Sequence, residues 1–340
     1  MSTGLILSLV LLAGALIWYG IEKSRRRSHA MDGGIHTDIT LPHEAPFELY
    51  SNAFSHCSRK ARLAMAELGI AYTHRPIDLV ETGQYQTISP AYLKVNPAGI
   101  LPVLVHNGHP IYESDDILKY AAAHAGPDAP QLTPDDPQKL AAMNEWLDYC
   151  NITNDDPLGN PEGRLGPCVP ALTMPIFVTM MQYISFKKLI PGLLFHPDKK
   201  RPFFFSAAKL FGLRGLMRAK PLTDLVGDAR DAARNHLKKL DDALGASQGD
   251  WILDDQFTLA DITLASALLR IAETGWLDYF KSLDGLPHVA AYYERLQARP
   301  SWQTAITDKQ HHLVEQGSND LKALLKGDQL IKSTLQPLAN

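Results

Sequence analysis

The segment Phe47–Leu68 is the part of the chain that most restricts its fold. Its first residues form a compact apolar run typical of a strand, and a polar pair ends that run. From Ser58 apolar residues recur at helical spacing until Gly69, a residue type that commonly ends helices. The predicted helix therefore begins close to Ser55. Its N-terminus offers unpaired N–H groups and the positive end of a dipole, a site that favours an anion such as a thiolate.

The residues that follow predict an open α/β layer. Residues 70–77 alternate as a second strand that lies parallel to the first. Residues 101–105 and 110–112 read as two further strands around a hairpin turn, and 113–124 as a helix with acidic residues in its first turn. The order is β-α-β, then β-β-α. This order is typical of a sheet with helices packed on its faces.

The second half of the chain is predicted to be helical almost throughout. Four prolines mark residues 126–137 as a linker, and apolar stripes at helical spacing follow it. Thr258 and Asp261 stand at capping-box spacing before an apolar helix. The expected organisation is a segment 1–27, a tether 28–46, an α/β domain 47–125, the linker, an all-helical domain 138–310 with an insertion at about 160–221, and a helical tail 311–340.

The N-terminal segment is predicted to be a membrane anchor. Residues 4–21 carry no charge and are long enough to cross a bilayer core at about 1.5 Å per residue. Lys23 and three arginines follow at once, which places the rest of the chain in the cytoplasm by the positive-inside rule. A cleaved signal peptide is the alternative, but no positive residue precedes the apolar stretch. Residues 28–46 are expected to form a flexible tether.

Composition excludes some classes of function. The net charge of −4 gives no sign of nucleic-acid binding, and three widely spaced cysteines make no disulfide framework. The insertion differs from the charge balance of the whole chain, because residues 187–220 hold nine basic residues and one acidic residue among many aromatic ones. That mixture suits an anionic membrane surface, and several prolines argue against a spanning helix. The alternative is an enlarged helical hairpin with a solvated basic face.

Four motifs in order resemble the cytosolic glutathione transferase superfamily. They are SHCSRKARLAMAELGI, NPAGILPVL, YESDDILKYA and FTLADITLASAL. The similarity extends over about residues 47–302 and is greatest to the serine-using zeta and tau classes and related bacterial members. It implies a thioredoxin-like N-terminal domain, an all-helical C-terminal domain and glutathione as co-substrate, here behind one transmembrane helix.

The resemblance assigns roles to individual residues. Ser55 falls at the catalytic position, where its hydroxyl would donate a hydrogen bond to the glutathione sulfur. Leu101 and Pro102 match the cis-proline turn that pairs with the cysteinyl backbone. Glu113 would bind the γ-glutamyl ammonium and Ser114 the γ-glutamyl carboxylate.

Further candidates for glutathione contact are less specific. His56 and Cys57 lie beside the position of the sulfur, where His56 would act as a base or be merely solvated. Gln84 and Lys94 are candidates for the glycyl end. Each role has a structural alternative, because Ser55 is also an ordinary helix cap, Cys57 a small buried residue and Glu113 a first-turn acid. No metal site is expected, since His311 and His312 have no matching ligand set.

These features predict a glutathione-dependent transferase or lyase that acts on a hydrophobic electrophile at the membrane surface. The alternative is a non-catalytic, membrane-tethered interaction protein of the same fold. The lipid bilayer is the expected partner of residues 4–21 and of 187–220, and a homodimer is expected by resemblance. The sequence does not identify the second substrate, nor does it separate conjugation from ether cleavage, isomerisation or dehalogenation.

Overall fold

A mixed five-stranded sheet forms the centre of the N-terminal domain in the computed structural model, which describes residues 3–152 and 156–337. The strand order is β1-β5-β4-β2-β3. Strands β2 and β3 are parallel, whereas β4 pairs with β2 and β5 in antiparallel fashion. The strands are β1 (Gly34–Ile35), β2 (Phe47–Ser51), β3 (Thr73–Pro76), β4 (Val103–His106) and β5 (His109–Tyr112). The predicted order of β-α-β and then β-β-α is confirmed.

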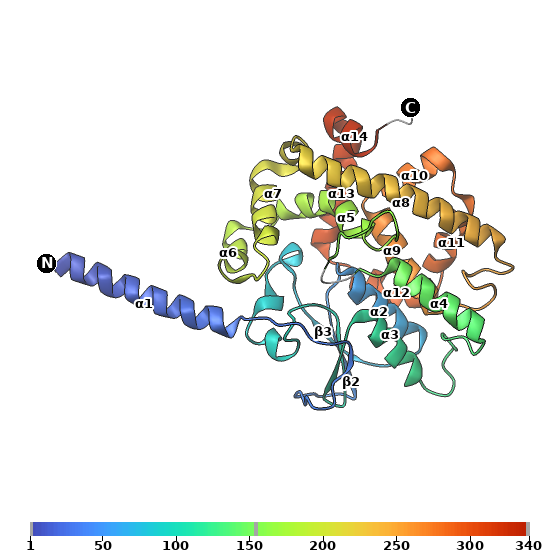
Figure 1. Cartoon of the computed structure of the whole chain (residues 1–340), viewed down its shortest axis with the longest axis horizontal. Coiled ribbons are helices and arrows are strands. Elements are labelled where there is room, and N and C mark those ends of the chain that lie inside the picture. The colour runs from blue at the N-terminus through green and yellow to red at the C-terminus, as the bar shows by residue number, and fades with distance from the viewer. Residues whose placement is uncertain (1–2, 153–155, 338–340) are drawn as a thin grey trace.

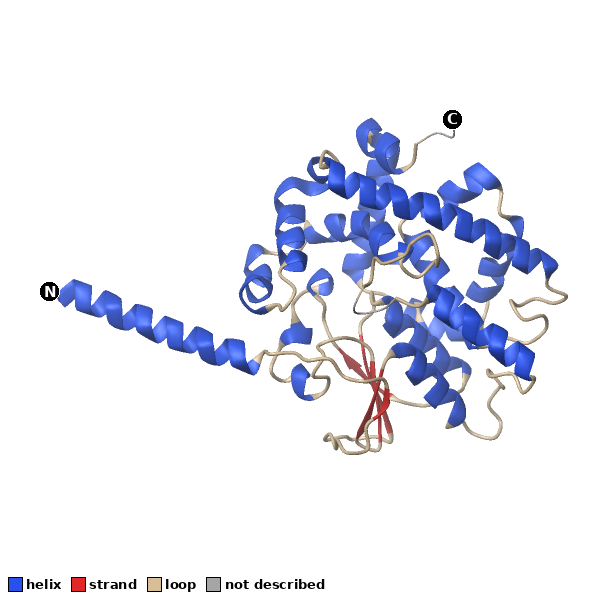
Figure 2. Ribbon diagram, in the orientation of Figure 1, coloured by secondary structure: helices blue, strands red, loops and turns tan. Residues whose placement is uncertain are grey.

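Two helices pack on this sheet, as Figure 2 shows. Helix α2 (His56–Glu67) buries Ala61, Ala64 and Met65, and α3 (Ser114–Ala123) packs against α2. Gly69 follows α2 with φ of +64°, a conformation that glycine adopts at little cost. Three short 3-10 helices, Val80–Thr82, Gln86–Ile88 and Tyr92–Lys94, lie between β3 and β4.

Helices form the rest of the globular body. They are α4 (Pro137–Cys150), α5 (Cys168–Met181), α6 (Phe186–Phe195), α7 (Lys200–Leu216), α8 (Lys220–Ala246), α9 (Leu259–Glu273), α10 (Trp276–Asp284), α11 (Pro287–Gln297), α12 (Pro300–Ala305), α13 (His312–Gly327) and α14 (Gln329–Leu335), with a 3-10 turn at Thr307–Lys309. The predicted insertion is not a separate unit. Its helix α5 contributes Leu172, Ile176 and Met180 to the main hydrophobic core.

A buried carboxylate fixes the start of the central helix α9. Asp261 accepts hydrogen bonds from the Thr258 N–H at 2.7 Å, the Ile252 N–H at 3.1 Å and the Tyr292 hydroxyl at 2.8 Å. The predicted capping box at Thr258 and Asp261 is therefore confirmed. Since α9 packs against both α2 and α4, this cap also fixes how the helical domain meets the sheet domain.

Buried ion pairs join the two domains. The Arg59 guanidinium donates to both carboxylate oxygens of Glu273 at 2.8 and 3.0 Å, and Arg299 binds Glu67 in the same bidentate way. The Arg62 guanidinium donates to the Ala305 carbonyl at 2.8 Å. Charged groups this deeply buried need such partners, and bidentate pairing fixes their geometry. The orientation of α2 relative to the helical domain is thus defined by polar contacts as well as by packing.

The N-terminal helix α1 (Thr3–Arg25) projects from the globular body (Figure 1). None of its described residues is buried, and within the part of the chain that the structure describes it is the one helix long and apolar enough to cross a membrane. Only its final turns touch the body. The Trp18 and Tyr19 rings lie 6.1 and 5.7 Å from the Phe195 ring of α6, and Arg26 just after α1 donates to the Ile88 carbonyl at 3.2 Å.

Residues 28–46, expected as a flexible tether, are instead held along the sheet. Strand β1 extends the sheet beside β5, with Gly34 opposite Tyr112. The His29 N–H donates to the Pro97 carbonyl at 3.0 Å, and the N–H of the buried Leu41 donates to Gly108 at 2.7 Å. The exposed edge of β5 supplies the unpaired backbone groups that make this arrangement favourable. Helix α1 is therefore joined to the domain by an ordered segment.

Candidate active site

The sequence-predicted site residues gather at one end of the sheet because of its strand order. Tyr50 near the end of β2 lies opposite Val103 at the start of β4, and Leu104 lies opposite Ile111 near the end of β5. The turn after β2, the turn before β4 and the turn after β5 therefore meet at the same edge. These three turns carry Ser55, Leu101–Pro102 and Glu113–Ser114 respectively.

Ser55 occupies the N-cap position of α2. Its hydroxyl oxygen accepts a hydrogen bond from the Ser58 N–H at 3.2 Å, and the Asn52 side chain fixes the preceding turn by accepting from the Phe54 and Ser55 N–H groups. The Ser55 side chain is partly exposed. Because its oxygen is the acceptor in the cap, the hydroxyl proton remains available for an anion at the helix N-terminus. Capping and hydrogen-bond donation are therefore compatible roles for Ser55.

Cys57 and Ser114 bring the N-termini of α2 and α3 together. Burial raises the pKa of the Cys57 thiol, and the charge of Lys60 and a hydrogen bond with Ser114 partly oppose that effect. Lys60 of α2 forms an ion pair with Asp115 of α3. A protonated, half-buried Cys57 at this position fits packing better than nucleophilic attack.

The other two turns present backbone groups to the same region. The Leu101–Pro102 peptide bond is cis, and β4 begins only at Val103, so Leu101 lies outside the ladder with β2. Glu113 stands at the N-cap of α3 with φ of +60°. The N-terminal segment passes close by, since a Cβ at Gly33 would lie 3.3 Å from the Glu113 Cβ. A Cβ there would also lie 2.1 Å from the Asp116 Oδ2, so the Asp116 side chain would have to move to admit one.

His56, Gln84 and Lys94 are less closely associated with these turns. His56 is buried against α9, where the Ser266 hydroxyl donates to the His56 carbonyl at 2.8 Å and lies 3.0 Å from its Nδ1. Burial holds the pKa of His56 well below its usual value, so the ring is neutral and joins the domains. The Gln84 amide contacts Asp78, and Lys94 is exposed at the end of its 3-10 helix.

An aromatic ladder, formed by Phe54, Phe177 and Phe205, covers the turn before Ser55. Phe54 meets Phe177 of α5 edge-on at 5.5 Å between ring centroids, and Phe177 meets Phe205 of α7 at 5.6 Å. The Arg270 guanidinium lies 3.7 Å from the Phe54 ring centroid and hydrogen-bonds the Phe54 carbonyl. Sequence reasoning missed this ladder. The position of Phe54 directly before Ser55 is the one local signal for it.

The helices α6 and α7 also contact the loop that follows β3. Arg201 of α7 donates to the carboxylate of buried Glu81 at 2.8 Å. Gly192 of α6 packs directly on Tyr85, since a Cβ at this glycine would come within 2.4 Å of the ring. These contacts explain why position 192 has no side chain. They attach the predicted insertion to the sheet domain at the end where the site lies.

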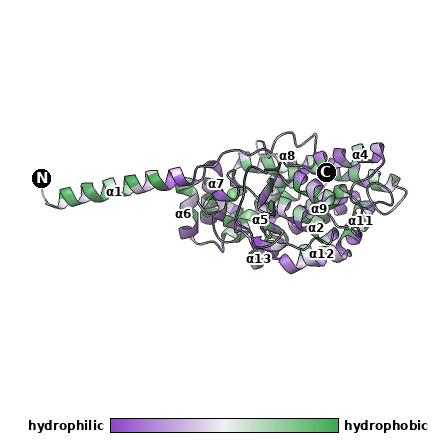
Figure 3. Ribbon diagram, turned by 90° about the horizontal axis from the view of Figure 1, so that it is seen from below, coloured by the Kyte–Doolittle hydropathy of each residue, from purple (hydrophilic) through white to green (hydrophobic). Residues whose placement is uncertain are grey.

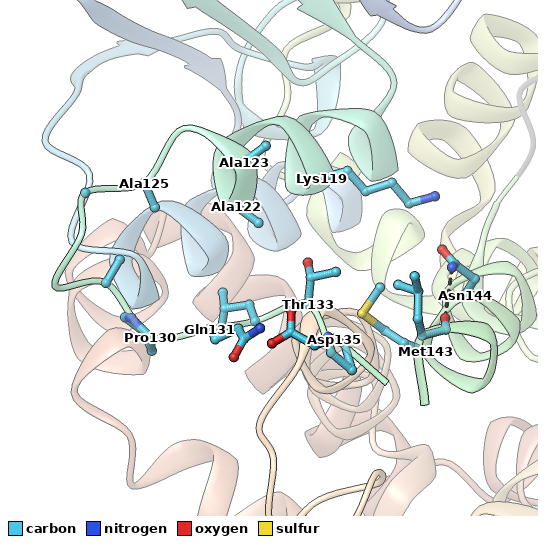
Figure 4. Close-up of a pocket in the computed structure, with 15 residues that line it drawn as sticks. Lys119, Ala122, Ala123, Ala125, Pro130, Gln131, Thr133, Asp135, Met143 and Asn144 are labelled. Carbon is cyan, nitrogen blue, oxygen red and sulfur yellow. Dashed lines mark hydrogen bonds between the residues drawn. The ribbon is translucent and has the colours of Figure 1, made fainter. Parts of the chain in front are cut away.

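A separate surface cleft of about 620 Å³ lies between α3, the linker and α4 (Figure 4). Lys119, Thr133 and Met143 are among the residues that line it. None of the sequence-predicted site residues lines this cleft, so it is distinct from the candidate active site.

The structure gives no candidate metal centre within residues 3–152 and 156–337, because no three His, Cys, Asp or Glu side chains there are grouped to hold an ion. The ring of His311 instead accepts the Leu313 N–H at 3.2 Å and caps α13. His312 begins that helix and stacks on His311.

Comparison with known proteins assigns both domains to one superfamily. Residues 49–129 match the family model described as glutathione S-transferase, N-terminal domain, and residues 217–295 match the glutathione S-transferase, C-terminal domain. Both domains of this chain therefore match domains of the glutathione S-transferase superfamily. Residues 130–216, which include α4 to α7, lie between the two matched segments.

Individual relatives agree with this assignment. The chain is 24% identical to glutathione S-transferase F9 of Arabidopsis thaliana over 73% of its own length and 91% of that protein. It is 48% identical to a 2,5-dichlorohydroquinone reductive dechlorinase of Sphingobium indicum, but over 20% of this chain and 19% of that protein. Its fold is similar to that of the β-etherase LigF from Sphingobium sp. strain SYK-6, with a TM-score of 0.61 and 19% identity over 78% of this chain and all of LigF.

Proposed function

We propose that this glutathione S-transferase family member is a glutathione-dependent transferase or lyase that acts on a hydrophobic electrophile at a membrane surface. Glutathione binds in the extended form along the Leu101–Pro102 turn, and the N-terminus of α3 holds its γ-glutamyl group through Ser114 and Glu113. Ser55 donates a hydrogen bond to the glutathione sulfur and stabilises the thiolate, as in the serine-using classes. The thiolate then attacks the electrophile and displaces its leaving group.

The convergence of two helix N-termini on one site is the observation that carries this proposal. Ser55 caps α2, Ser114 begins α3, and Cys57 bridges them by its contact with Ser114. Each helix N-terminus stabilises a nearby negative charge. Glutathione presents two such charges in the required arrangement, one on its thiolate and one on its γ-glutamyl carboxylate.

The hydrophobic character of the second substrate is supported by the aromatic ladder. Phe54 lies next to Ser55 in sequence and packs on the partly exposed Phe177 of α5, which in turn packs on the buried Phe205 of α7. A substrate that reaches the sulfur from this side meets Phe177, the partly exposed ring of the ladder, while Phe54, Phe205 and Arg270 are buried behind it. Aromatic ethers and halides have the matching chemistry, and the names of LigF and the dechlorinase point to the same classes.

The membrane location is supported by α1 and its flank. The helix has 23 residues with high hydropathy, and basic residues from Lys23 to Arg27 follow its apolar part. Under this proposal α1 crosses the bilayer once and the globular body lies on the cytoplasmic side. The alternative of a non-catalytic interaction protein is less well supported, because Ser55, Pro102, Glu113 and Ser114 are all retained.

Retention on immobilised glutathione tests the proposal. The wild-type chain is expected to bind and to be eluted by free glutathione. Ser114→Ala is expected to weaken the affinity by on the order of 10- to 100-fold, the value of a charge-assisted hydrogen bond. Ser185→Ala is the matched control, because Ser185 precedes α6 and makes no side-chain cap bond. Equal retention of both variants, or no retention of the wild type, contradicts the proposed site.

A further inference from the structure

Helices α6 and α7 each expose an apolar stripe at helical spacing. On α6 the exposed residues are Phe186, Ile190, Leu193 and Leu194, with 37–51% of each accessible, whereas Leu189 and Gly192 face the protein. On α7 they are Phe203, Leu210 and Phe211, with 63–64% accessible, whereas Phe205 and Ala208 are buried. Both helices therefore direct apolar side chains outward in addition to those that they bury. Such a contiguous exposed apolar surface marks an interaction site.

This α6–α7 surface lies beside the membrane-spanning candidate. Figure 1 shows α6 and α7 on the side of the body from which α1 projects, and Figure 3 shows that α1 is hydrophobic except near this junction. The Trp18 and Tyr19 rings contact Phe195 at the end of α6. Trp18 precedes Arg25 by seven residues, about 10 Å along a helix axis. The end of α6 therefore reaches the level of the apolar part of α1, not only its basic flank.

The charge of the α6–α7 surface indicates which kind of partner it binds. Lys187 and Lys188 flank the apolar stripe of α6, Lys200 begins α7, and all three are exposed. Other basic residues of this region already have partners, since Arg201 binds Glu81 and Arg214 binds Asp328. Lysines around an outward apolar stripe complement a layer of anionic headgroups above acyl chains.

We propose that the α6–α7 surface lies in the headgroup layer of an anionic bilayer and forms a second membrane contact beside α1. Its apolar stripes enter the boundary of the acyl chains, and Lys187, Lys188 and Lys200 bind anionic headgroups. The inference deepens and rests on the membrane part of the proposed function, but it requires no glutathione chemistry. Since the buried Phe205 joins α7 to Phe177 of the aromatic ladder, the contact places lipid on the outer side of a helix that packs against the ladder.

Vesicle binding by residues 28–340 tests the inference without the anchor. No residue of α1 belongs to either hydrophobic core cluster, so the shortened chain keeps its complete core. It is expected to sediment with vesicles of phosphatidylcholine and phosphatidylglycerol at low salt and to be released at high salt. Vesicles of phosphatidylcholine alone are expected to bind much less protein.

Charge reversal locates the contact. Lys187→Glu, Lys188→Glu and Lys200→Glu together are expected to weaken binding by on the order of 100-fold or more, because each lysine near an anionic surface strengthens it about five-fold. The matched control reverses three exposed lysines elsewhere, Lys119, Lys238 and Lys326, and keeps the same net charge. Lys199 is left unchanged, since its ammonium caps α6 through the Leu193 and Leu194 carbonyls. Circular dichroism melting verifies that every variant is folded.

Three results would overturn the inference. The first is failure of the folded chain 28–340 to bind anionic vesicles at low salt. The second is equal loss of binding in both triple variants. The third is a lipid-free dimer that Phe211→Ser dissociates, which would make a second copy of the chain the occupant. Loss of glutathione retention with vesicle binding intact would reject only the enzymatic part of the proposed function.

Discussion

Ser55 caps α2 in the structure and is proposed to donate a hydrogen bond to glutathione, and three substitutions separate these two roles. The hydroxyl oxygen accepts the Ser58 N–H at 3.2 Å and caps α2, while its proton is assigned to the glutathione sulfur. Ser55→Ala removes both roles. Ser55→Asp keeps a capping acceptor but has no proton to donate at neutral pH. Ser55→Thr keeps the cap and the donor.

The expected magnitudes differ for stability and for rate. Loss of the cap in Ser55→Ala costs about 1 kcal/mol of the free energy of unfolding, whereas Ser55→Asp and Ser55→Thr change it by a few tenths. Loss of the hydrogen bond to the thiolate costs about 1.5–3 kcal/mol, which corresponds to on the order of 10- to 100-fold in rate. Ser55→Asp is expected to lose more, because its carboxylate repels the thiolate. Ser55→Thr is expected to retain most activity.

The assay combines urea unfolding with initial rates on an aromatic halide and glutathione. The wild type, Ser55→Asp and Ser55→Thr are expected to have similar free energies of unfolding, and Ser55→Ala a lower one. The rate is expected to be highest for the wild type and then to decrease in the order Ser55→Thr, Ser55→Ala and Ser55→Asp. Full activity of Ser55→Ala would refute the assignment of the donor to Ser55 and direct attention to Cys57. Near-wild-type rates for Ser55→Asp and Ser55→Thr, with a loss of rate only in the destabilised Ser55→Ala, would show that Ser55 acts only as a cap.

Three further outcomes are expected. Arg59→Met leaves Glu273 buried without its bidentate partner and is expected to lower the free energy of unfolding by about 3–5 kcal/mol. Lys220→Met, in an exposed pair, is the control and is expected to change it by less than about 1 kcal/mol. Urea titration measures both, and a small loss for Arg59→Met would contradict the interdomain role. Burial lowers the pKa of His74 to about 4, so between about pH 6.5 and 4 the unfolded chain binds a proton that the folded chain does not. Stability is therefore expected to fall as the pH drops through this window, and to fall less steeply in His74→Asn. Equal slopes for the two proteins would reject the assignment. Deletion of residues 1–27 is expected to move the protein into the soluble fraction at high salt, and a mature N-terminus near Met31 would instead indicate a cleaved signal.

Features set by local sequence could be predicted, and they include the start of the helix that Ser55 caps. Ser55 precedes a periodic helix that Gly69 ends, and Thr258 and Asp261 stand at capping-box spacing before another; both helices begin where the sequence indicates. The hairpin of β4 and β5 was predictable for the same reason, because Asn107 and Gly108 adopt the positive φ values that its turn requires.

Features set by long-range pairing could not be predicted from one sequence. Arg59 and Arg270 look like exposed helix residues, yet both are buried beside Glu273, more than two hundred residues after Arg59. Strand β1 has only two residues and no strand-like pattern, and it forms because the edge of β5 is available. In sequence Arg201 resembles a lipid-binding residue, but in the structure its guanidinium forms an ion pair with the buried Glu81. Each of these depends on a partner that local periodicity does not reveal.

The ionisation of bound glutathione tests the central claim most directly. The ultraviolet absorbance of the thiolate is followed as a function of pH for glutathione bound to the wild-type chain and to Ser55→Ala. Two helix N-termini and the Ser55 hydroxyl are predicted to lower the pKa of the bound thiol at least one unit below the value of about 8.5 for an ordinary cysteine thiol, and Ser55→Ala is predicted to return it part of the way. A bound thiol that titrates like the free one in the wild-type chain would contradict the account.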